Sequence, residues 1–217
     1  MSKKLRIGVI GAGRIGKLHS NNLVNRVPDA ELVAVSDVYE PAAKDLGEKL
    51  GVAYYSDYHK ILEDPTIDAV FICSSTDTHS PISIEAAKAG KHIFCEKPID
   101  HDLDKIKAVL EEVKKAGVKY QVGFNRRFDR NFKHVHEVVK NGGIGDVHIV
   151  KVTSRDPEAP PLSYVKVSGG IFVDMTIHDF DMVRYLSGSE VEEVSAVGTC
   201  LVNPEIGEAG DVDTCII

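Results

Sequence analysis

The chain has 217 residues, 43% hydrophobic and 27% charged, a composition that excludes a disordered chain and fits one large or two small globular domains. Its formal net charge of −7 disfavours nucleic acid and anionic membrane surfaces as partners. No apolar run reaches the roughly 20 residues that span a bilayer, and the run at residues 5–10 is too short for a signal peptide. The four cysteines show no C-x-x-C spacing, so we expect a reducing cytoplasm.

Short β-branched runs alternate with helical stretches along residues 1–123. We predict strands at 5–10, 31–36, 68–73, 91–95 and 118–122, and helices at 14–25, 41–50, 80–90 and 103–116. The strands are continuously apolar, which is typical of a parallel sheet covered by helices on both faces. The predicted fold class is therefore α/β, with a doubly wound parallel sheet in an N-terminal domain that ends at Gly123.

The pattern changes after Gly123, and residues 124–217 form a predicted second domain. We predict helices at 127–140 and 171–186, strands at 147–154, 191–202 and 212–217, and a proline-rich loop at 156–161. The sequence stops at Ile217 within a strand-like run, which would leave an unpaired edge. We therefore expect the chain to be part of a longer protein, with its second domain incomplete.

A glycine-rich motif directly follows the first predicted strand and opens the first predicted helix. It consists of Gly11, Ala12, Gly13, Arg14, Ile15 and Gly16, and it matches G-x-G-x-x-G. Gly11 allows the tight turn, Gly13 lets the backbone approach a pyrophosphate, and Gly16 permits close packing of helix on strand. The helix N-terminus adds free N–H donors. The motif predicts a dinucleotide site, the alternative being a glycine-rich turn without a ligand.

Polar residues also follow two later strands, at the edge where a dinucleotide would lie. Asp37 closes the second strand about 20 residues beyond the motif, where a carboxylate binds the ribose hydroxyls and repels a 2′-phosphate. This favours NAD over NADP, although an aspartate that caps the next turn is the alternative. Ser74 and Thr76 follow a further strand and either border the cofactor or belong to an ordinary loop.

Glu96, Lys97 and Pro98 follow the strand that ends at Cys95. A lysine at this edge faces the expected place of the nicotinamide and can orient a substrate hydroxyl by its charge. Pro98 restricts Lys97 to extended geometry and so fixes its direction. Taken alone, these three residues are also ordinary surface composition.

Ionisable residues form a stripe on the predicted helix at 171–186. Asp174, His178 and Asp181 are spaced i, i+4, i+7 and share one face, which Tyr185 continues. Most other positions are apolar, so we expect the helix to be buried and its ionisable groups to be paired or functional. One alternative is that the histidine and a carboxylate bind a metal, but no third ligand lies at a recognisable spacing. Another alternative is a structural His–Asp pair.

Together these segments resemble the glucose–fructose oxidoreductase and inositol dehydrogenase family, and two of them point to its inositol branch. The matching segments are residues 11–16 with Asp37, residues 96–98, 124–129, 154–157 and 169–182. The resemblance implies a Rossmann domain followed by an α+β domain with an open, mostly antiparallel sheet that usually mediates homo-oligomers, dimers or tetramers. It implies Lys97, Asp174 and His178 as the catalytic set, with Arg127 and Asp156 near the substrate. We also expect Glu96 and Lys97 to border the cofactor, and we expect no metal.

The expected function is that of an NAD-dependent dehydrogenase that oxidises a ring secondary alcohol of a cyclitol, with myo-inositol converted to its 2-keto product. The expected partner is thus a small polyhydroxylated substrate. Another sugar or cyclitol, such as scyllo-inositol or glucose, is an alternative substrate. A non-catalytic NAD-binding sensor is an alternative of another class, although a binding-only module needs no proton acceptor.

Overall fold

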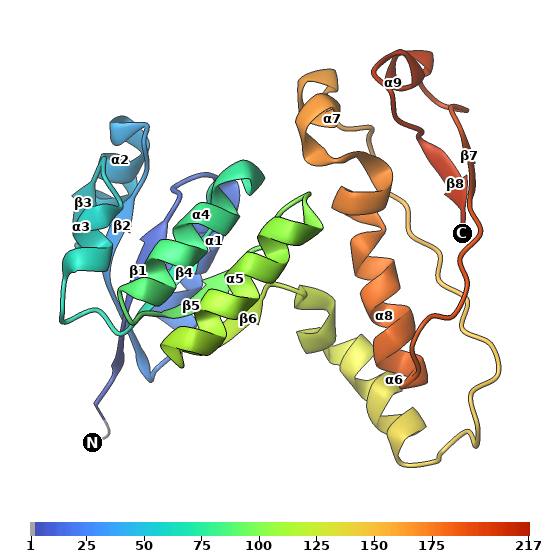
Figure 1. The fold of residues 1–217 in the computed structure, drawn as a ribbon, viewed down its shortest axis with the longest axis horizontal. Coiled ribbons are helices and arrows are strands. Elements are labelled where there is room, and N and C mark those ends of the chain that lie inside the picture. Colours follow the sequence, from blue (N-terminus) through green and yellow to red (C-terminus); the bar gives the residue numbers. More distant parts are fainter. Residues whose placement is uncertain (1–2) are drawn as a thin grey trace. The chain divides into compact units, whose positions relative to one another are not determined.

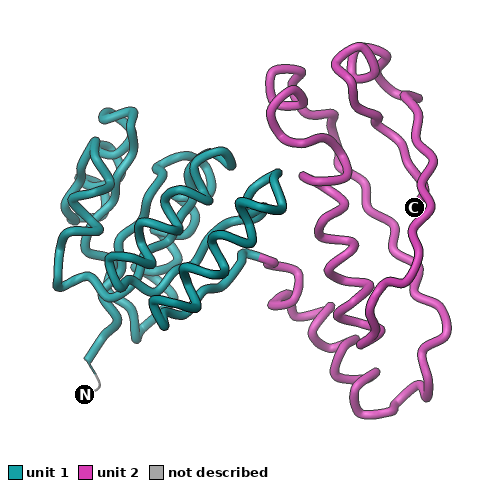
Figure 2. The backbone as a smooth tube through the Cα atoms, in the orientation of Figure 1, with its two compact units in different colours: residues 1–123 teal, residues 124–217 magenta. Residues whose placement is uncertain are grey.

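The computed structural model describes residues 3–217. The chain divides into two compact units, and Figure 2 colours them separately. Unit 1 comprises the residues up to Gly123, and unit 2 comprises Phe124–Ile217.

Unit 1 is built on one six-stranded parallel sheet with the strand order β3-β2-β1-β4-β5-β6 (Figure 1). The strands are β1 (Leu5–Ile10), β2 (Ala30–Ser36), β3 (Ala53–Tyr55), β4 (Ala69–Ile72), β5 (His92–Cys95) and β6 (Tyr120–Val122). The order reverses between β1 and β4, which pair directly. In a doubly wound sheet the ligand crevice lies beyond the carboxyl ends of the strands at this reversal.

Helices cover both faces of this sheet. They are α1 (Arg14–Arg26), α2 (Glu40–Leu50), α3 (His59–Glu63), α4 (Thr76–Lys88) and α5 (Leu103–Ala116). Helices α4 and α5 lie side by side in Figure 1. One apolar cluster includes Ile82 of α4 and Val109 of α5. The other cluster includes Leu23 of α1 and Leu46 of α2. The sheet is therefore buried between two apolar layers, which explains its continuously apolar strands.

Unit 2 is mostly helical. Its elements are η1 (Asn125–Phe128), α6 (Arg130–Lys140), α7 (Leu162–Ser168), the π-helical turn η2 (Ile171–Met175), α8 (Ile177–Ser187), β7 (Val197–Thr199), α9 (Pro204–Glu208) and β8 (Thr214–Ile216). Strands β7 and β8 form a two-stranded antiparallel sheet. Only three of its apolar side chains are buried, those of Val165, Met182 and Ile206. Residues 124–217 thus bury few apolar side chains among themselves.

The predicted fold class is confirmed, but several predicted elements are wrong. Helix α4 begins at Thr76 rather than at residue 80, because Ser75 adopts the extended cap conformation and Pro81 is accommodated inside the helix. Residues 147–154 form no strand, since no strand among the described residues pairs with them. The strand predicted at 191–202 is reduced to β7. The short elements β3, α3, α7 and α9 were not predicted, because such lengths carry little periodicity.

The two long helices predicted in unit 2 are each divided. The first begins as the 3-10 turn η1, and Asp129 then caps α6 by accepting the N–H groups of Asn131 and Phe132. The second begins as η2 and continues as α8. Its expected burial is wrong, because Asp181 and Met182 are the only buried residues of η2 and α8. Phe172 and Phe180 remain exposed there.

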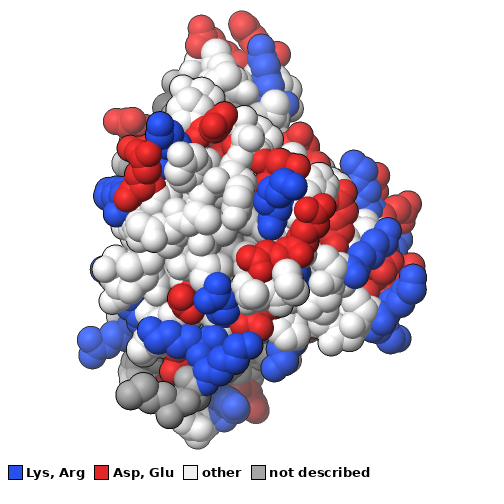
Figure 3. Space-filling model, turned by 90° about the vertical axis from the view of Figure 1, so that its left-hand side faces the viewer, with Lys and Arg blue, Asp and Glu red and all other residues white. Residues whose placement is uncertain are grey.

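The surface of unit 1 carries charges of both signs. On the face that Figure 3 shows, acidic and basic side chains lie beside one another in several places, around a broad area without charged side chains. Exposed ion pairs of this unit include Lys17 with Asp45 and Lys44 with Glu48. Within residues 3–217, no helix is both long enough and apolar enough to cross a bilayer.

Candidate active site

The glycine turn of unit 1 is shaped by contacts that only glycine allows. Gly11 has a φ of +101°, and a Cβ there would come within 2.6 Å of the Cys73 and Ser74 backbone. A Cβ on Gly16 would lie 1.8 Å from the Gly11 carbonyl oxygen. Around Gly13 the opposite holds, because a Cβ would meet nothing within 4 Å. The turn is therefore packed against neighbouring backbone at Gly11 and Gly16 and is open at Gly13. This open backbone fits the approach of a pyrophosphate.

Asp37 joins the end of β2 to this turn. Its Oδ2 accepts the Ala12 N–H at 2.7 Å, and its Oδ1 accepts the Tyr39 N–H at 2.9 Å. The turn-capping alternative is thus present in the structure. The carboxylate is half-buried, so part of it remains accessible to a ribose, and that role stays a prediction.

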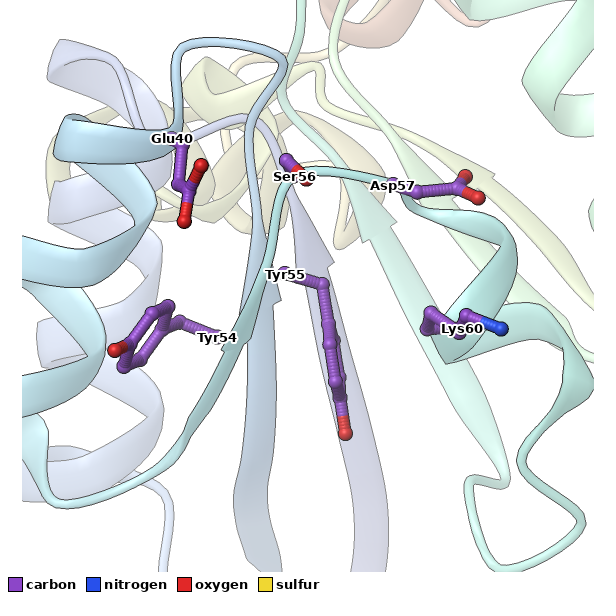
Figure 4. Close-up of a pocket in the computed structure, with 6 residues that line it drawn as sticks. All are labelled: Glu40, Tyr54, Tyr55, Ser56, Asp57 and Lys60. Atoms are coloured by element: carbon purple, nitrogen blue, oxygen red, sulfur yellow. The ribbon is translucent and has the colours of Figure 1, made fainter.

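A hollow of about 260 Å³ lies at the carboxyl end of the neighbouring strand β3 (Figure 4). It adjoins Asp37, whose backbone N–H donates to the Tyr55 carbonyl. Its charged lining consists of Glu40, Asp57 and Lys60. Two carboxylates and one ammonium group make this lining acidic on balance, as Asp37 is.

The ends of β4 and β5 bring further predicted residues to the same edge of the sheet. Ser74 follows β4, and its Oγ lies 2.6 Å from the Thr78 Oγ1, while Thr76 begins α4. Burial raises the pKa of the Cys95 thiol to about 11 and also raises the pKa of the Cys73 thiol. Neither cysteine therefore supplies a thiolate at this edge.

Glu96 and Lys97 directly follow β5. The Glu96 Oε1 lies 2.7 Å from the His19 Nε2, and the His19 ring packs edge-on against Phe71 and Phe94. Lys97 is half-buried, and the Lys97–Pro98 peptide bond is cis. Sequence analysis missed His19, because a single histidine on α1 carries no pattern of its own. It links the helix after the glycine turn to the residue before Lys97.

In unit 2, two arginines of η1 hold two aspartates of α8. The Arg127 Nε and Nη2 donate to the Asp181 carboxylate at 2.7–3.0 Å, and these bonds raise the pKa of Arg127. Arg126 and the hydroxyl of Ser154 both donate to Asp179. Asp181 is only 6% exposed, so its charge depends on this partner.

The predicted stripe of ionisable residues thus divides into two parts. Asp181 binds Arg127, and the Tyr185 ring stacks on His136 with 3.8 Å between ring centroids, so these two stripe residues bind η1 and α6. Asp174 and His178 lie towards the start of the segment. Asp174 accepts the Tyr164 hydroxyl at 2.9 Å, and the His178 ring meets the Phe124 ring edge-on.

The turn that carries Asp174 is fixed from the far end of the unit. The Asp211 carboxylate accepts the Ile171 N–H. A Cβ on Gly170 would lie 2.6 Å from the Asp211 Oδ1. Sequence analysis missed Asp211, because 40 residues separate it from Ile171 and no local spacing links them. Asp156, a predicted substrate residue, lies exposed in the proline-rich loop.

Two family models match the chain. Residues 5–124 match an oxidoreductase family with an NAD-binding Rossmann fold, and residues 132–217 match the GFO/IDH/MocA C-terminal domain. The chain belongs to the GFO/IDH/MocA oxidoreductase family. The resemblance expected from the sequence is therefore confirmed, and the glycine turn of unit 1 is that of the family's NAD-binding Rossmann fold.

Relatives within the GFO/IDH/MocA family are similar along nearly the whole chain. The chain is 58% identical over 98% of its length to the myo-inositol 2-dehydrogenase of Thermotoga maritima. It is 44% identical over 100% of its length to a scyllo-inositol 2-dehydrogenase (NAD(+)) of Bacillus subtilis. It covers 64% of each of these proteins.

A solved structure matches the fold closely. The scyllo-inositol dehydrogenase from Lactobacillus casei, with bound NAD(H) and scyllo-inositol, superposes with a TM-score of 0.90 at 35% identity. The match covers 98% of this chain and 65% of that one. The chain therefore spans slightly less than two thirds of the length of these relatives.

In this GFO/IDH/MocA family member, each unit carries some of the predicted site residues. Unit 1 carries the cofactor residues and Lys97, and unit 2 carries Asp174, His178 and Arg127. Residues 3–217 contain no group of three histidine, cysteine or acidic side chains that could hold a metal ion. The roles of the predicted catalytic, cofactor and substrate residues stay predictions.

Proposed function

We propose that the protein formed by this chain is an NAD-dependent dehydrogenase that oxidises a ring secondary alcohol of a cyclitol. The first candidate reaction converts myo-inositol to 2-keto-myo-inositol, a step of inositol catabolism. The observation that carries this proposal is the glycine turn, closed at Gly11 and Gly16 and open at Gly13, on a sheet edge that also carries Asp37 and Lys97. The inositol dehydrogenases among its relatives support the substrate class.

The cofactor would be held by unit 1. The open backbone at Gly13 and the start of α1, with Arg14 and Ile15, would bind the pyrophosphate. Asp37 would bind the ribose, and the other bordering residues would be Ser74, Thr76, Glu96 and Lys97. NAD supplies the acceptor for the hydride that leaves the substrate carbon.

The protein would handle the substrate and its proton. His178 would accept the proton of the reacting hydroxyl through a ring nitrogen lone pair, while the ammonium group of Lys97 would stabilise the developing alkoxide. Asp174 would orient the imidazole or hold the substrate. Arg127 and Asp156 would lie near the substrate hydroxyls, and Arg127 would do so while bound to Asp181.

A second candidate substrate is scyllo-inositol. It is supported by the 44% identity to a scyllo-inositol 2-dehydrogenase and by the fold match to an enzyme with scyllo-inositol bound. The chemistry would be the same, because both substrates offer a secondary ring alcohol. Only the direction of the substrate hydroxyls relative to the bound cofactor would differ.

We also propose that the protein acts in the cytoplasm as a homo-oligomer, a dimer or a tetramer. The four cysteines are all free, as expected for a reducing compartment. In the two-stranded sheet of β7 and β8 each strand keeps an outer edge, which supports pairing with a further strand.

The test is turnover with NAD and a panel of cyclitols and sugars, using the full-length protein. His178→Ala should lower kcat by about 10²–10⁴, the usual contribution of a general base, while a separate titration shows little change in NAD affinity. His134→Ala is the matched control, because His134 is exposed on α6 of the same unit. Near-normal kcat in His178→Ala would contradict the base assignment. NAD binding without turnover of any polyol would instead identify a sensor.

A further inference from the structure

His79 is a buried histidine of α4 to which sequence analysis assigned no role. Its side chain is only 2% exposed, in contact with the backbone at the carboxyl edge of the sheet. Nδ1 lies 2.8 Å from the Pro98 carbonyl oxygen, and Nε2 lies 3.1 Å from the Ser74 carbonyl oxygen. Both ring nitrogens therefore face backbone acceptors, so the ring acts as a donor in this site.

The two acceptors belong to loops that leave neighbouring strands. Ser74 follows β4 and Pro98 follows β5, and these strands pair with Ile72 opposite Cys95. The last ladder bond between them is donated by the Glu96 N–H to the Ile72 carbonyl. Beyond that point the ladder no longer holds the two loops together, and His79 spans them.

The two contacts differ in what they hold. Pro98 is the residue directly after Lys97, whereas Ser74 belongs to the loop that leads into α4. A neutral imidazole has one N–H and donates to one of the two oxygens, while an imidazolium donates to both. The Nδ1 contact is the shorter one. The ring donates to the Pro98 carbonyl as an imidazolium and also as the neutral tautomer that carries its proton on Nδ1.

Lys97 is thereby held from both sides along the chain. Its predecessor Glu96 contacts His19 of α1 through the carboxylate, and its successor Pro98 contacts His79 of α4 through the carbonyl. The neighbouring helices thus fix the backbone on which the Lys97 side chain stands. A small displacement of that backbone would move the ammonium group away from the alkoxide that it is proposed to stabilise.

We propose that His79 is a positioning residue for Lys97, acting by donation of its Nδ1–H to the Pro98 carbonyl. This inference rests on the proposed function, because it assigns His79 a part in catalysis only through Lys97. His79 touches neither substrate nor reacting atoms in this scheme. Its effect therefore belongs in kcat rather than in the affinity for NAD.

Two conservative variants of the full-length protein separate the two contacts. In His79→Asn the side-chain amide nitrogen takes the place of Nδ1, so the bond to Pro98 is kept. In His79→Gln the amide nitrogen takes the place of Nε2, so only the bond to Ser74 is kept. We expect kcat with NAD and inositol to fall about 10-fold to 10²-fold in His79→Gln, the range that a misplacement near 1 Å costs, and to change little in His79→Asn.

A second experiment tests whether His79 acts through Lys97. In a Lys97→Ala background, His79→Gln should lower kcat no further, because the group that it positions is already gone. In either background, His79→Gln should leave NAD affinity unchanged. His92→Gln is the matched control, since His92 begins β5 at the opposite edge of the sheet and bonds the Lys119 N–H. It should leave kcat unchanged.

The outcomes distinguish this inference from the proposed function. Equal loss of kcat in His79→Asn and His79→Gln, or a full additional loss in the Lys97→Ala background, overturns the positioning role. Normal kcat in Lys97→Ala itself overturns the proposed role of Lys97 and this inference with it. If thermal unfolding shows that His79→Gln does not fold, His79→Asn alone decides. Because His79→Asn keeps the bond to Pro98, a lowered kcat with normal NAD affinity in this variant overturns the inference, and an unchanged kcat supports it.

Discussion

The two units of the molecule are stabilised in different ways. In unit 1, two apolar clusters cover the two faces of one sheet. In unit 2, the buried apolar side chains are Val165, Met182 and Ile206, and ion pairs such as Arg127 with Asp181 join the helical elements. Among the described residues, unit 1 is therefore joined by apolar burial, while ion pairs and hydrogen bonds join the helical elements of unit 2.

This difference separates the two parts of the proposed site. The glycine turn and Lys97 stand on a rigid layered scaffold, where backbone positions are fixed by strands and close helix packing. Asp174 and His178 stand on a π-helical turn and the first turn of α8, which are held by single polar contacts such as that of Asp211 with Ile171. Substitutions should accordingly act through packing in unit 1 and through charge in unit 2.

The largest effect on stability is expected at Gly16 of unit 1. Gly16→Ala places a Cβ 1.8 Å from the Gly11 carbonyl oxygen, so the backbone must shift. We expect the free energy of unfolding to fall by about 3 kcal/mol, the upper range for overpacking, as measured by urea denaturation. Gly13→Ala is the control, because its Cβ meets nothing within 4 Å. It should leave stability nearly unchanged and weaken NAD binding, and equal stability of the two variants would refute the packing argument.

The next effect is expected at the ion pair between η1 and α8 of unit 2. Arg127→Met leaves the Asp181 carboxylate, 6% exposed, without its bidentate donor. Because the Arg127 side chain is itself 39% exposed, we expect the free energy of opening of α8 to fall by about 2 kcal/mol, less than the cost of breaking a fully buried pair. Hydrogen exchange of the α8 amides measures this free energy. In the control Arg184→Met, which breaks the exposed pair with Glu190, exchange in α8 should stay unchanged.

The same contrast explains which elements the sequence predicted. The long strands and helices of unit 1, such as β1 and α5, follow from local periodicity because each buries a continuous apolar face. Residues 147–154 alternate as a strand does, but a strand also needs a paired neighbour, which local sequence does not supply. Periodicity likewise predicted a helix at 171–186 but not its π-helical start, which depends on distant Asp211.

The site was predictable to a similar degree. The glycine turn, Asp37 and Lys97 are marked by their place after a strand, and the structure brings them to one edge of the sheet. The contacts of His19, His79 and Asp211 were not predictable from the sequence. Each of these residues stands alone without a motif, and each contacts a residue that is distant in the sequence.

A smaller effect concerns the choice of cofactor by unit 1. Asp37→Ser removes the negative charge beside the ribose site but keeps a hydroxyl that can accept the Ala12 N–H. We expect the preference for NAD over NADP to fall about tenfold, which corresponds to about 1.4 kcal/mol, in titrations with both cofactors. The control Asp45→Ser changes an exposed carboxylate of α2 that pairs with Lys17. Tight NADP binding by the unsubstituted protein would contradict the ribose role of Asp37.

The smallest effect is a local acid-induced opening in unit 2. The Asp213 carboxylate accepts the N–H groups of Asn203, Leu201 and Val202 at 2.8–2.9 Å, and these bonds, that of Asn203 first, hold its pKa well below the ordinary value. A carboxyl group with a lowered folded-state pKa stabilises the fold fully above its unfolded value of about 3.9, and this contribution is lost as the pH falls through the folded pKa.

We therefore expect the amides of Leu201, Val202 and Asn203 to lose protection as the pH falls below about 4, while amides of β1 in unit 1 stay protected by the apolar layers around them. The measurement is hydrogen exchange, with each rate divided by its intrinsic rate at the same pH. Asp213→Asn cannot ionise but keeps one oxygen acceptor, so its exchange at these amides should be faster near neutral pH and nearly independent of acid. If that variant showed the same acid dependence as the unsubstituted protein, another group would control the segment, and the polar contacts of Asp213 would not be what holds this part of unit 2.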